Sequence, residues 1–232
     1  MTFVVAEIGV NWDGDFALLE KMMSAARKAG CDAVKFQAFN EDIVKAHPES
    51  ARLMSSAVTS QNIERIDKLA RDKGIEWFAT PMYLDAVKLL DPYVKRFKVR
   101  EFDGRKIIRN EPSELFENIS KTKKEIIISS EESPKNSSHY QNPNIRWLYC
   151  VPKYPCTLSE IDFSSLSDFD GYSNHHPHFI APLTAAILGA GIIEVHVTMD
   201  KSKSYIDNNV SFDFNELENM IQLIKKSESI KK

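Results

Sequence analysis

Two histidines at the ends of neighbouring apolar segments are the residues of this sequence best suited to bind a metal ion. His175 ends the segment GYSNH (171–175), and His196 lies in the segment IIEVHVTM (192–199), with a helical pattern between them. If both segments are adjacent parallel strands, the two imidazoles point into one mouth. Imidazoles on adjacent strands can together hold a divalent metal ion. The pair therefore predicts a metal site at the ends of these strands.

Other strand-like segments also end in charged and hydroxyl side chains. Because side chains alternate along a strand, every second residue near each end should face the same mouth. An unpaired charge inside an apolar segment would cost several kcal/mol, so Glu7, Lys35 and Lys98 need partners or an ionic ligand. The residues that this pattern brings to the mouth are Glu7, Lys35, Gln37, Thr80, Lys98, Arg100, Ser129 or Ser130, Tyr154, Ser173, His175, Glu194 and His196.

The combined chemistry of such a mouth is more specific than that of any one residue. Lysines, an arginine and hydroxyl groups can hold a small phosphorylated or carboxylated anion. A metal ion bound by two histidines can polarise a carbonyl group. Together they favour carbon–carbon bond formation onto an aldehyde. Taken singly, a lysine can be a strand-edge residue, a serine a turn residue and a histidine a core residue, so the prediction depends on their convergence.

Helices and strands alternate along the chain in a way that would place these residues at one end of a barrel. Eight strand-like segments separated mostly by helices are typical of an α/β fold, the (β/α)8 or TIM barrel, here as a single domain over residues 1–232. A doubly wound sheet is the alternative, although no glycine-rich phosphate motif follows the first strand. Segments 40–58 and 131–144 are expected to be loops. The expected strands are 3–10, 33–39, 75–82, 96–100, 125–130, 145–151, 169–175 and 192–199, and the expected helices are 15–29, 59–73, 84–90, 112–120, 179–190 and 214–227.

The composition excludes several classes of protein. The formal net charge is −3, which argues against a general binder of nucleic acid or of anionic membranes. There is no apolar run of about 18 residues, and the first residues lack the basic region and cleavage site of a signal peptide. The three cysteines, Cys31, Cys150 and Cys156, have no metal-ligand spacing and suit reduced thiols. We therefore expect a cytoplasmic protein.

Seven motifs spread along nearly the whole chain, in the same order, resemble the sialic acid synthase family. This family comprises N-acetylneuraminate synthase and its legionaminic and pseudaminic acid relatives. The resemblance implies a metal-dependent condensation of phosphoenolpyruvate with an open-chain N-acylated amino sugar, which yields a nine-carbon 2-keto acid and phosphate. The motifs are AEIGVNWDGD, AVKFQAF, GIEWFATPM, FKVREFD, CVPKYP, GYSNH, and EVHVTMD followed by YIDNNVS.

The resemblance also implies roles for single residues. His175 and His196 correspond to the ligands of Mn²⁺ or Mg²⁺. The implied catalytic residues are Glu7, Tyr154 and Asp207, of which Glu7 or Asp207 would move protons if its pKa is suitably tuned. The implied substrate-binding residues are Lys35, Gln37, Thr80, Lys98, Arg100, Ser130 and Ser173.

Several positions depart from the family pattern, mainly on the side expected to hold phosphate. Glu101 stands where a hydroxyl would contact the phosphate, and its carboxylate would repel the anion unless a nearby cation pairs with it. Pro152 replaces a usual asparagine, Glu131 a glycine, and Trp12 a common histidine. The family's C-terminal antifreeze-like domain, which lends an arginine to the partner subunit's sugar site, is not expected in this chain.

These departures leave more than one function open. We favour a divergent synthase that acts on small-molecule substrates, because buried charges without a use are costly to keep. The alternatives are a sugar-acid-binding or aldolase-like barrel that has lost the condensation, and a partner subunit of a separate antifreeze-like protein. A homodimer is expected from the resemblance.

Overall fold

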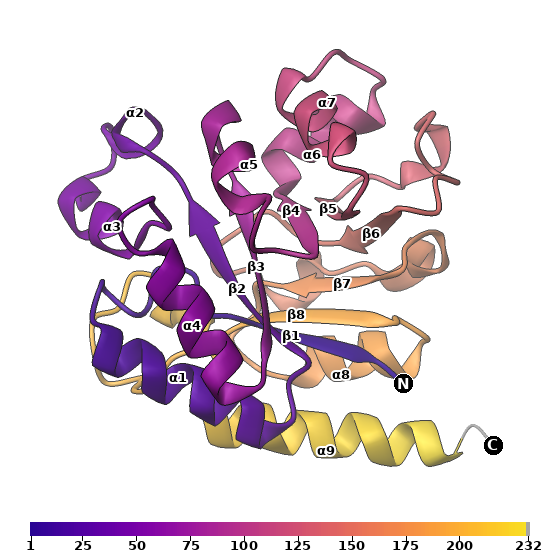
Figure 1. The fold of residues 1–232 in the computed structure, drawn as a ribbon. Coiled ribbons are helices and arrows are strands. Elements are labelled where there is room, and N and C mark those ends of the chain that lie inside the picture. The colour runs from indigo at the N-terminus through magenta and orange to yellow at the C-terminus, as the bar shows by residue number, and fades with distance from the viewer. Residues whose placement is uncertain (231–232) are drawn as a thin grey trace.

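Eight parallel strands form a closed barrel in the computed structural model, which describes residues 1–230 (Figure 1). Their order around the barrel is β1 to β8, with β8 paired to β1. The predicted TIM barrel is therefore confirmed, and the doubly wound sheet is not formed. The predicted domain, 1–232, extends two residues beyond the described part. The strands are β1 (Phe3–Glu7), β2 (Ala33–Ala38), β3 (Glu76–Pro81), β4 (Arg96–Val99), β5 (Glu125–Ser130), β6 (Ile145–Tyr149), β7 (Gly171–Asn174) and β8 (Ile192–His196).

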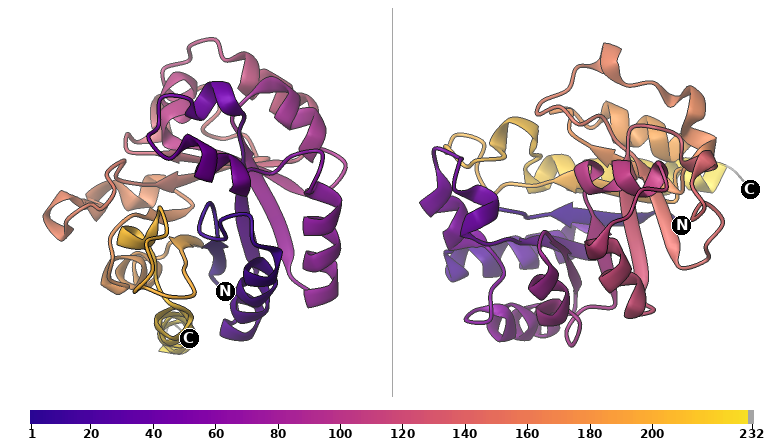
Figure 2. Two further views of the ribbon diagram at one scale, coloured as in Figure 1. Left: turned by 90° about the vertical axis from the view of Figure 1, so that its left-hand side faces the viewer. Right: turned by 90° about the horizontal axis from the view of Figure 1, so that it is seen from above.

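Helices follow most of the strands and cover the outside of the barrel (Figures 1 and 2). The first and last helices, α1 and α9, lie side by side. The connections β5–β6 and β6–β7 contain only short 3₁₀ helices, as the loop-like sequence 131–144 predicts for the first of them. The α-helices are α1 (Phe16–Ala29), α2 (Glu41–Val44), α3 (Ser50–Ser56), α4 (Ile63–Lys73), α5 (Leu84–Leu90), α6 (Glu101–Ile108), α7 (Glu114–Lys121), α8 (Ile180–Ile187) and α9 (Phe214–Ile230).

Helix α1 shows how sequence signals set the ends of an element. The carboxylate of Asp15 accepts hydrogen bonds from the backbone N–H groups of Ala17 and Leu18 and so caps the first turn. Gly30 ends the helix in the left-handed conformation, with φ 97°. Between these caps, an apolar stripe packs on the barrel; it consists of Leu19, Met22, Met23 and Ala26.

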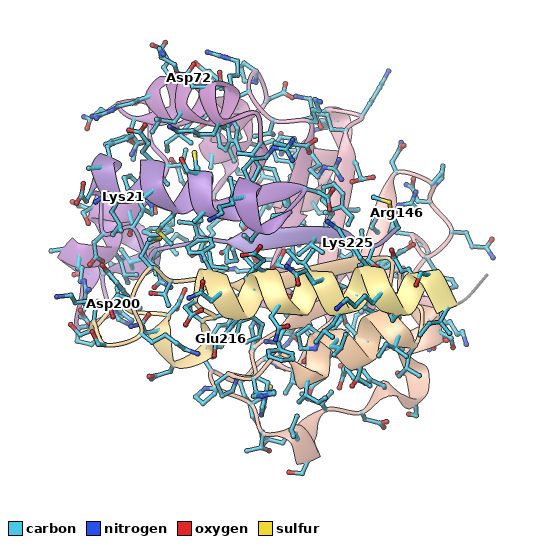
Figure 3. The ribbon with its side chains drawn as sticks, turned by 90° about the horizontal axis from the view of Figure 1, so that it is seen from below. Lys21, Asp72, Arg146, Asp200, Glu216 and Lys225 are labelled. Carbon is cyan, nitrogen blue, oxygen red and sulfur yellow. The ribbon has the colours of Figure 1, made fainter. Side chains whose placement is uncertain are left out.

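The opposite faces of the outer helices are polar. Figure 3 shows α9 from outside, with Glu216 and Lys225 among the charged side chains that surround the barrel. Its buried face consists of Leu217, Met220, Ile221 and Ile224. Within residues 1–230, no helix combines the length and the apolar character needed to cross a membrane.

Three helices were not predicted. The segment 40–58, expected to be a loop, contains α2 and α3, and the connection after β4 contains α6. In α6, Gly104 and several charged residues interrupt the helical spacing of apolar residues, so the sequence does not predict this helix. The glycine is required by packing, because a Cβ atom at Gly104 would lie 2.5 Å from the carbonyl oxygen of Ser129. Helix α6 therefore lies directly against β5 at the end of the barrel that carries the site.

Helix α3 is fastened to the loop after β1. The guanidinium of Arg52 is bidentate to the carboxylate of Asp13, with Nη2 2.7 Å from Oδ2. The indole Nε1 of Trp12 donates to the carbonyl oxygen of Ser56 at 3.1 Å. Gly14 has φ 74°, and a Cβ there would lie 2.6 Å from the carbonyl oxygen of Ser55. These contacts hold α3 over the carboxyl ends of β1 and β2.

Gly171→Ala tests the close approach of β7, which His175 follows, to β8, which carries His196. A Cβ at Gly171 would lie 2.1 Å from the carbonyl oxygen of Ile192, so the strands must separate. We expect a loss of about 3 kcal/mol in the free energy of unfolding, measured by urea denaturation. The control is Gly74→Ala, where no atom lies within 4 Å of the new Cβ. There only the left-handed backbone opposes the side chain, at about 1 kcal/mol. Equal losses in the two variants would contradict the proposed packing constraint.

Candidate active site at the mouth of the barrel

A cavity of about 520 Å³ opens at the carboxyl ends of the strands. This is the end at which TIM barrels carry their active sites. Strand pairing aligns Glu7 with Lys35 on one side and with His196 on the other, so residues of β1, β2 and β8 share one level. The predicted site residues that line the cavity are Glu7, Lys35, Gln37, Thr80, Lys98, Arg100, Tyr154, Ser173, His175, His196 and Asp207.

Ser130 is the one predicted site residue that does not line this cavity. Its hydroxyl donates to the carbonyl oxygen of Glu132 at 2.7 Å, and the serine of β5 that lines the cavity is Ser129. Lys98 pairs with Ile127 in the sheet, and Ser129 lies two residues after Ile127 on the same face of the strand. Strand alternation therefore favours Ser129, the alternative that the sequence left open.

Glu194 is the centre of a buried network of charges, although the sequence only suggested that it faces the mouth. Its Oε1 lies 2.8 Å from Nζ of Lys98 and 3.5 Å from Nζ of Lys35. The hydroxyl of Ser173 donates to the same oxygen at 3.0 Å. Lys35 also lies 3.1 Å from Oε1 of Glu7, which accepts a further hydrogen bond from Gln37 at 2.9 Å. Two lysines and two glutamates thus neutralise one another on the floor of the cavity.

The two lysines differ in their electrostatic surroundings. Burial opposes the charge of Lys35, but the carboxylates of Glu194 and Glu7 outweigh it and raise the pKa of Lys35. For Lys98 the effect of burial outweighs the attraction of Glu194. Repulsion from Lys35 adds to it, so the pKa of Lys98 is lowered. Burial would also raise the pKa of Glu194, but the two lysines hold it well below its ordinary value. Lys98 is consequently the lysine with the weaker hold on its proton.

Several polar atoms of the floor have no partner. Within residues 1–230, the buried atoms without a hydrogen bond include Oε2 of Glu7, Oε2 of Glu194 and Oγ of Ser129. All three residues line the cavity. Leaving such an atom unsatisfied costs about 1–3 kcal/mol, more if it is charged. These atoms are therefore aimed at a polar ligand or at water.

His175 is oriented by the backbone. Its Nδ1 lies 2.7 Å from the carbonyl oxygen of Val151, which fixes a proton on Nδ1 and leaves Nε2 for a ligand. Burial, together with the nearby His196, lowers the pKa of His175 to about 3. The imidazole is therefore neutral at pH 7, as a metal ligand must be.

His196 lies beside a carboxylate, in an ion-pair contact that lacks hydrogen-bond geometry. Its Nδ1 lies 3.3 Å from Oδ2 of Asp207. Burial opposes the charge of His196, but Asp207 outweighs it and raises the pKa of the imidazole. The same pair lowers the pKa of Asp207 against the effect of burial. The ring of Tyr154 lies over His175, with 3.9 Å between centroids, and its edge faces His196 at 5.7 Å.

The two histidines fit a metal ion as a pair. Their ring centroids are 5.6 Å apart, and each Nδ1 faces an oxygen atom, the arrangement that orients metal-binding imidazoles. In the described part of the chain, no group of three or more His, Cys, Asp or Glu residues is arranged to hold a metal. Two imidazoles would therefore be the protein's contribution, with oxygen atoms of water or substrate completing the coordination.

Two of the positions that depart from the family pattern, Glu101 and Pro152, line the cavity, whereas Glu131 and Trp12 do not. Glu101 lies at the start of α6, is only 9% exposed, and pairs with Arg105 at 2.6 Å between Oε1 and Nε. Arg100 pairs with Asp103 at 2.5 Å. The carboxylate of Glu101 thus has the cationic partner that the sequence required of it. Pro152 also lines this side of the cavity.

The cavity also has an apolar rim, which no pattern in the sequence predicts. Val10, Leu53, Met82 and Ile206 line the cavity from a small hydrophobic cluster that is separate from the main core. They come from four different connections, so no single segment carries the pattern. Trp12 is fully buried beneath α3 and does not line the cavity.

None of the three cysteines is suited to be a nucleophile. All are free and buried. Burial raises the pKa of Cys150, which lines the cavity, to about 12. Burial also raises the pKa of Cys156. The thiols therefore remain protonated at neutral pH.

An eight-stranded parallel barrel with a polar cavity at the carboxyl ends of its strands has the architecture of a TIM-barrel enzyme. The chain belongs to the NeuB family, whose model matches residues 22–232. This confirms the family predicted from the sequence motifs. The homologues are sialic, pseudaminic and legionaminic acid synthases, which supports a synthase-type enzyme.

Three relatives illustrate the similarity. The N,N'-diacetyllegionaminic acid synthase of Campylobacter jejuni is 30% identical over 97% of this chain and 76% of that protein. The pseudaminic acid synthase of the same organism is 27% identical over 98% of this chain and 74% of its own length. The crystal structure of N-acetylneuraminic acid synthetase from Leptospira borgpetersenii, in complex with citrate, matches with a TM-score of 0.87 and 26% identity. It covers 99% of this chain and 84% of that one.

Glu194→Gln tests the buried network. Removing one charge leaves two lysines without their shared carboxylate, so we expect a loss of about 3–5 kcal/mol in the free energy of unfolding at pH 7. Because the folded-state pKa of Glu194 lies below 4.5, the unfolded chain takes up the proton first as pH falls. The stability advantage of the wild type over the variant should therefore shrink below about pH 4.5.

Glu125→Gln is the matched control, measured by the same denaturation series at several pH values. Glu125 begins β5 at the opposite end of the barrel, is 31% exposed, and pairs with Arg96 at 2.5 Å. Its loss should cost only about 1 kcal/mol or less. A Glu194→Gln variant as stable as this control would show that the network contributes nothing to stability.

Proposed function

We propose that the protein condenses phosphoenolpyruvate with an open-chain N-acylated amino sugar to form a nonulosonic acid and phosphate. The observation that carries the proposal is the position of two oriented histidines beside unpartnered carboxylate and hydroxyl oxygens in one cavity. The names of the relatives, which are synthases of sialic, legionaminic and pseudaminic acids, support the class of product.

His175 and His196 would hold Mn²⁺ or Mg²⁺ through their Nε2 atoms. When bound, the ion would polarise the aldehyde of the sugar. The carbonyl oxygen of Val151 orients His175 through a hydrogen bond to Nδ1, and the carboxylate of Asp207 lies 3.3 Å from Nδ1 of His196. The ring of Tyr154 lies over His175 and forms the outer side of this half of the mouth.

The remaining cavity residues would position the reactants and move protons. C3 of phosphoenolpyruvate forms a bond to the aldehyde carbon, and the aldehyde oxygen becomes a hydroxyl by taking up a proton. Water adds to C2, and the resulting tetrahedral centre expels phosphate to leave the 2-keto acid. Glu7 is the residue we assign to the proton of this water, because its Oε2 is unpartnered. Lys98, Ser129 and Ser173 lie on the side of β4, β5 and β7, where they would hold the anionic donor.

The proposal extends to the setting in which the enzyme works. We assign it to the cytoplasm, where phosphoenolpyruvate is produced. The cavity is open to solvent, and Tyr154 at its edge is 58% exposed. A second copy of the chain, or a separate antifreeze-like protein, would close such a mouth and complete the sugar site.

A phosphate-release assay tests the reaction. The protein is mixed with Mn²⁺, phosphoenolpyruvate and a panel of N-acyl hexosamines, and we expect phosphate release with at least one sugar. Mass spectrometry of the product should show the combined mass of sugar and pyruvate. Binding of a nonulosonic acid without release from any sugar, also after addition of an antifreeze-like protein, would contradict the synthase and favour a sugar-acid-binding barrel.

Metal removal and His175→Gln provide the second test. Chelation by EDTA should abolish phosphate release, and Mn²⁺ should restore it. The variant should bind Mn²⁺ at least about tenfold more weakly, because one of two protein ligands is lost. Titration calorimetry checks the affinity, with His178→Gln as the control, since His178 does not line the cavity. Unchanged Mn²⁺ affinity in His175→Gln would contradict the assignment of this residue as a ligand.

A further inference from the structure

The cationic groups of the cavity are not equally free to bind an anion. Nζ of Lys35 faces three oxygen atoms of the protein, those of Glu7 at 3.1 Å, Glu194 at 3.5 Å and Thr80 at 3.5 Å. Nζ of Lys98 faces Glu194 at 2.8 Å, which leaves some of its three N–H groups for a ligand. Because two glutamates balance the two lysines, the floor has no excess positive charge to attract a phosphate.

Arg105 brings a guanidinium to the same side of the cavity; Glu101 balances its charge, so its contribution is hydrogen-bond donors. It lines the cavity from α6, and its side chain is 44% exposed. Nε donates to Oε1 of Glu101 at 2.6 Å, which fixes one edge of the guanidinium and leaves its Nη atoms for another acceptor. Arg100 is less available, because Nε pairs with Asp103 and Nη1 faces the sulfur of Met82.

The position of Arg105 is set by the packing of α6. The helix begins at Glu101, two residues after the end of β4, and Gly104 allows it to lie directly on Ser129 of β5. Glu101 and Arg105 are four residues apart and therefore share one face of α6, and both line the cavity. The face that carries Arg105 is thus held over the ends of β4 and β5, where Lys98 and Ser129 lie.

Ser129 shows independently that this side of the cavity is built for a ligand. The residue is 3% exposed, and within residues 1–230 its Oγ makes no hydrogen bond of ordinary geometry; only the thiol of Cys150, a weak donor, interacts with it. A hydroxyl, an ammonium group and the free edge of a guanidinium are the donors that a phosphate ester accepts. The Oε1 atoms of Glu194 and Glu101, by contrast, already have the cationic partners Lys98 and Arg105.

We propose that Arg105 binds the phosphate of phosphoenolpyruvate together with Lys98 and Ser129. The proposal rests on the proposed function, since phosphoenolpyruvate is its donor substrate. It assigns a binding role to a residue that the sequence did not single out. The guanidinium would take up the charge of the bound phosphate and of the phosphate that leaves, while Glu101 keeps it in place from the other edge.

Arg105→Gln and Arg105→Lys test this assignment. We expect the KM for phosphoenolpyruvate to rise about tenfold to a hundredfold in Arg105→Gln, the effect of losing charge-assisted hydrogen bonds. The KM for the amino sugar should stay unchanged. The KM of Arg105→Lys for phosphoenolpyruvate should lie between the values of the wild type and of Arg105→Gln. Lysine keeps the positive charge but lacks the paired N–H donors of the guanidinium. Arg109→Gln is the matched control: Arg109 follows the same helix, is paired with Glu132, and lies outside the cavity lining.

Direct binding separates this proposal from the proposed reaction. The affinity for phosphoenolpyruvate, with Mn²⁺ present and no sugar, is measured by titration calorimetry for wild type and variants, with circular dichroism as a check on folding. Weaker binding in a folded Arg105→Gln variant supports the anion site even if the wild type releases no phosphate with any sugar. Equal affinities in wild type and variant would overturn the assignment while leaving the synthase intact. The assignment also fails if the wild type does not bind phosphoenolpyruvate, or if only the KM for a phosphorylated sugar rises.

Discussion

The buried carboxylate of Glu194 is the interaction on which the rest of the mouth depends. Two lysine side chains are drawn into a largely apolar barrel because this one oxygen atom lies within 3.5 Å of both. Without it Lys98 would lose its ion-pair partner and Lys35 would keep only Glu7, although desolvation of a single ion costs several kcal/mol. Ser173 and Glu7 complete the same network, so polar contacts tie together five strands, β1, β2, β4, β7 and β8.

This network also explains which parts of the site could be predicted from sequence. The alternation of apolar and polar residues in β2, β7 and β8 is regular, so Lys35, Ser173, His175 and His196 were placed at the mouth correctly. The same alternation predicts that Glu194 faces inward, but its role depends on two lysines distant in sequence, which no local pattern relates to it. The resemblance to the family points to Ser130, whereas the alternation of side chains along β5 points to Ser129. The register with β4 decides for Ser129.

The elements beyond the strand ends were harder to predict, for physical reasons. Helix α6 contains Gly104, a poor helix former that is present because a backbone oxygen lies where its Cβ would be. Helices α2 and α3 are short and depend on contacts such as Arg52 with Asp13 rather than on their own propensity. The apolar rim has the same origin, since Val10, Leu53, Met82 and Ile206 become neighbours only after the barrel closes. Each of these features is determined by long-range packing, which the spacing of apolar residues within one segment does not indicate.

The changed residues of α6 are best understood together with their partners. A glutamate in place of a small hydroxyl residue predicts repulsion of any phosphate. Taken alone, Glu101 would therefore favour a barrel that no longer binds phosphoenolpyruvate. The structure pairs that carboxylate with Arg105, so the two side chains together add no net charge to the mouth. A guanidinium held at one edge by a carboxylate still presents donors at the other edge. The substitution therefore changes the chemical groups on this side of the cavity without making it acidic, and an anionic donor remains compatible with the site.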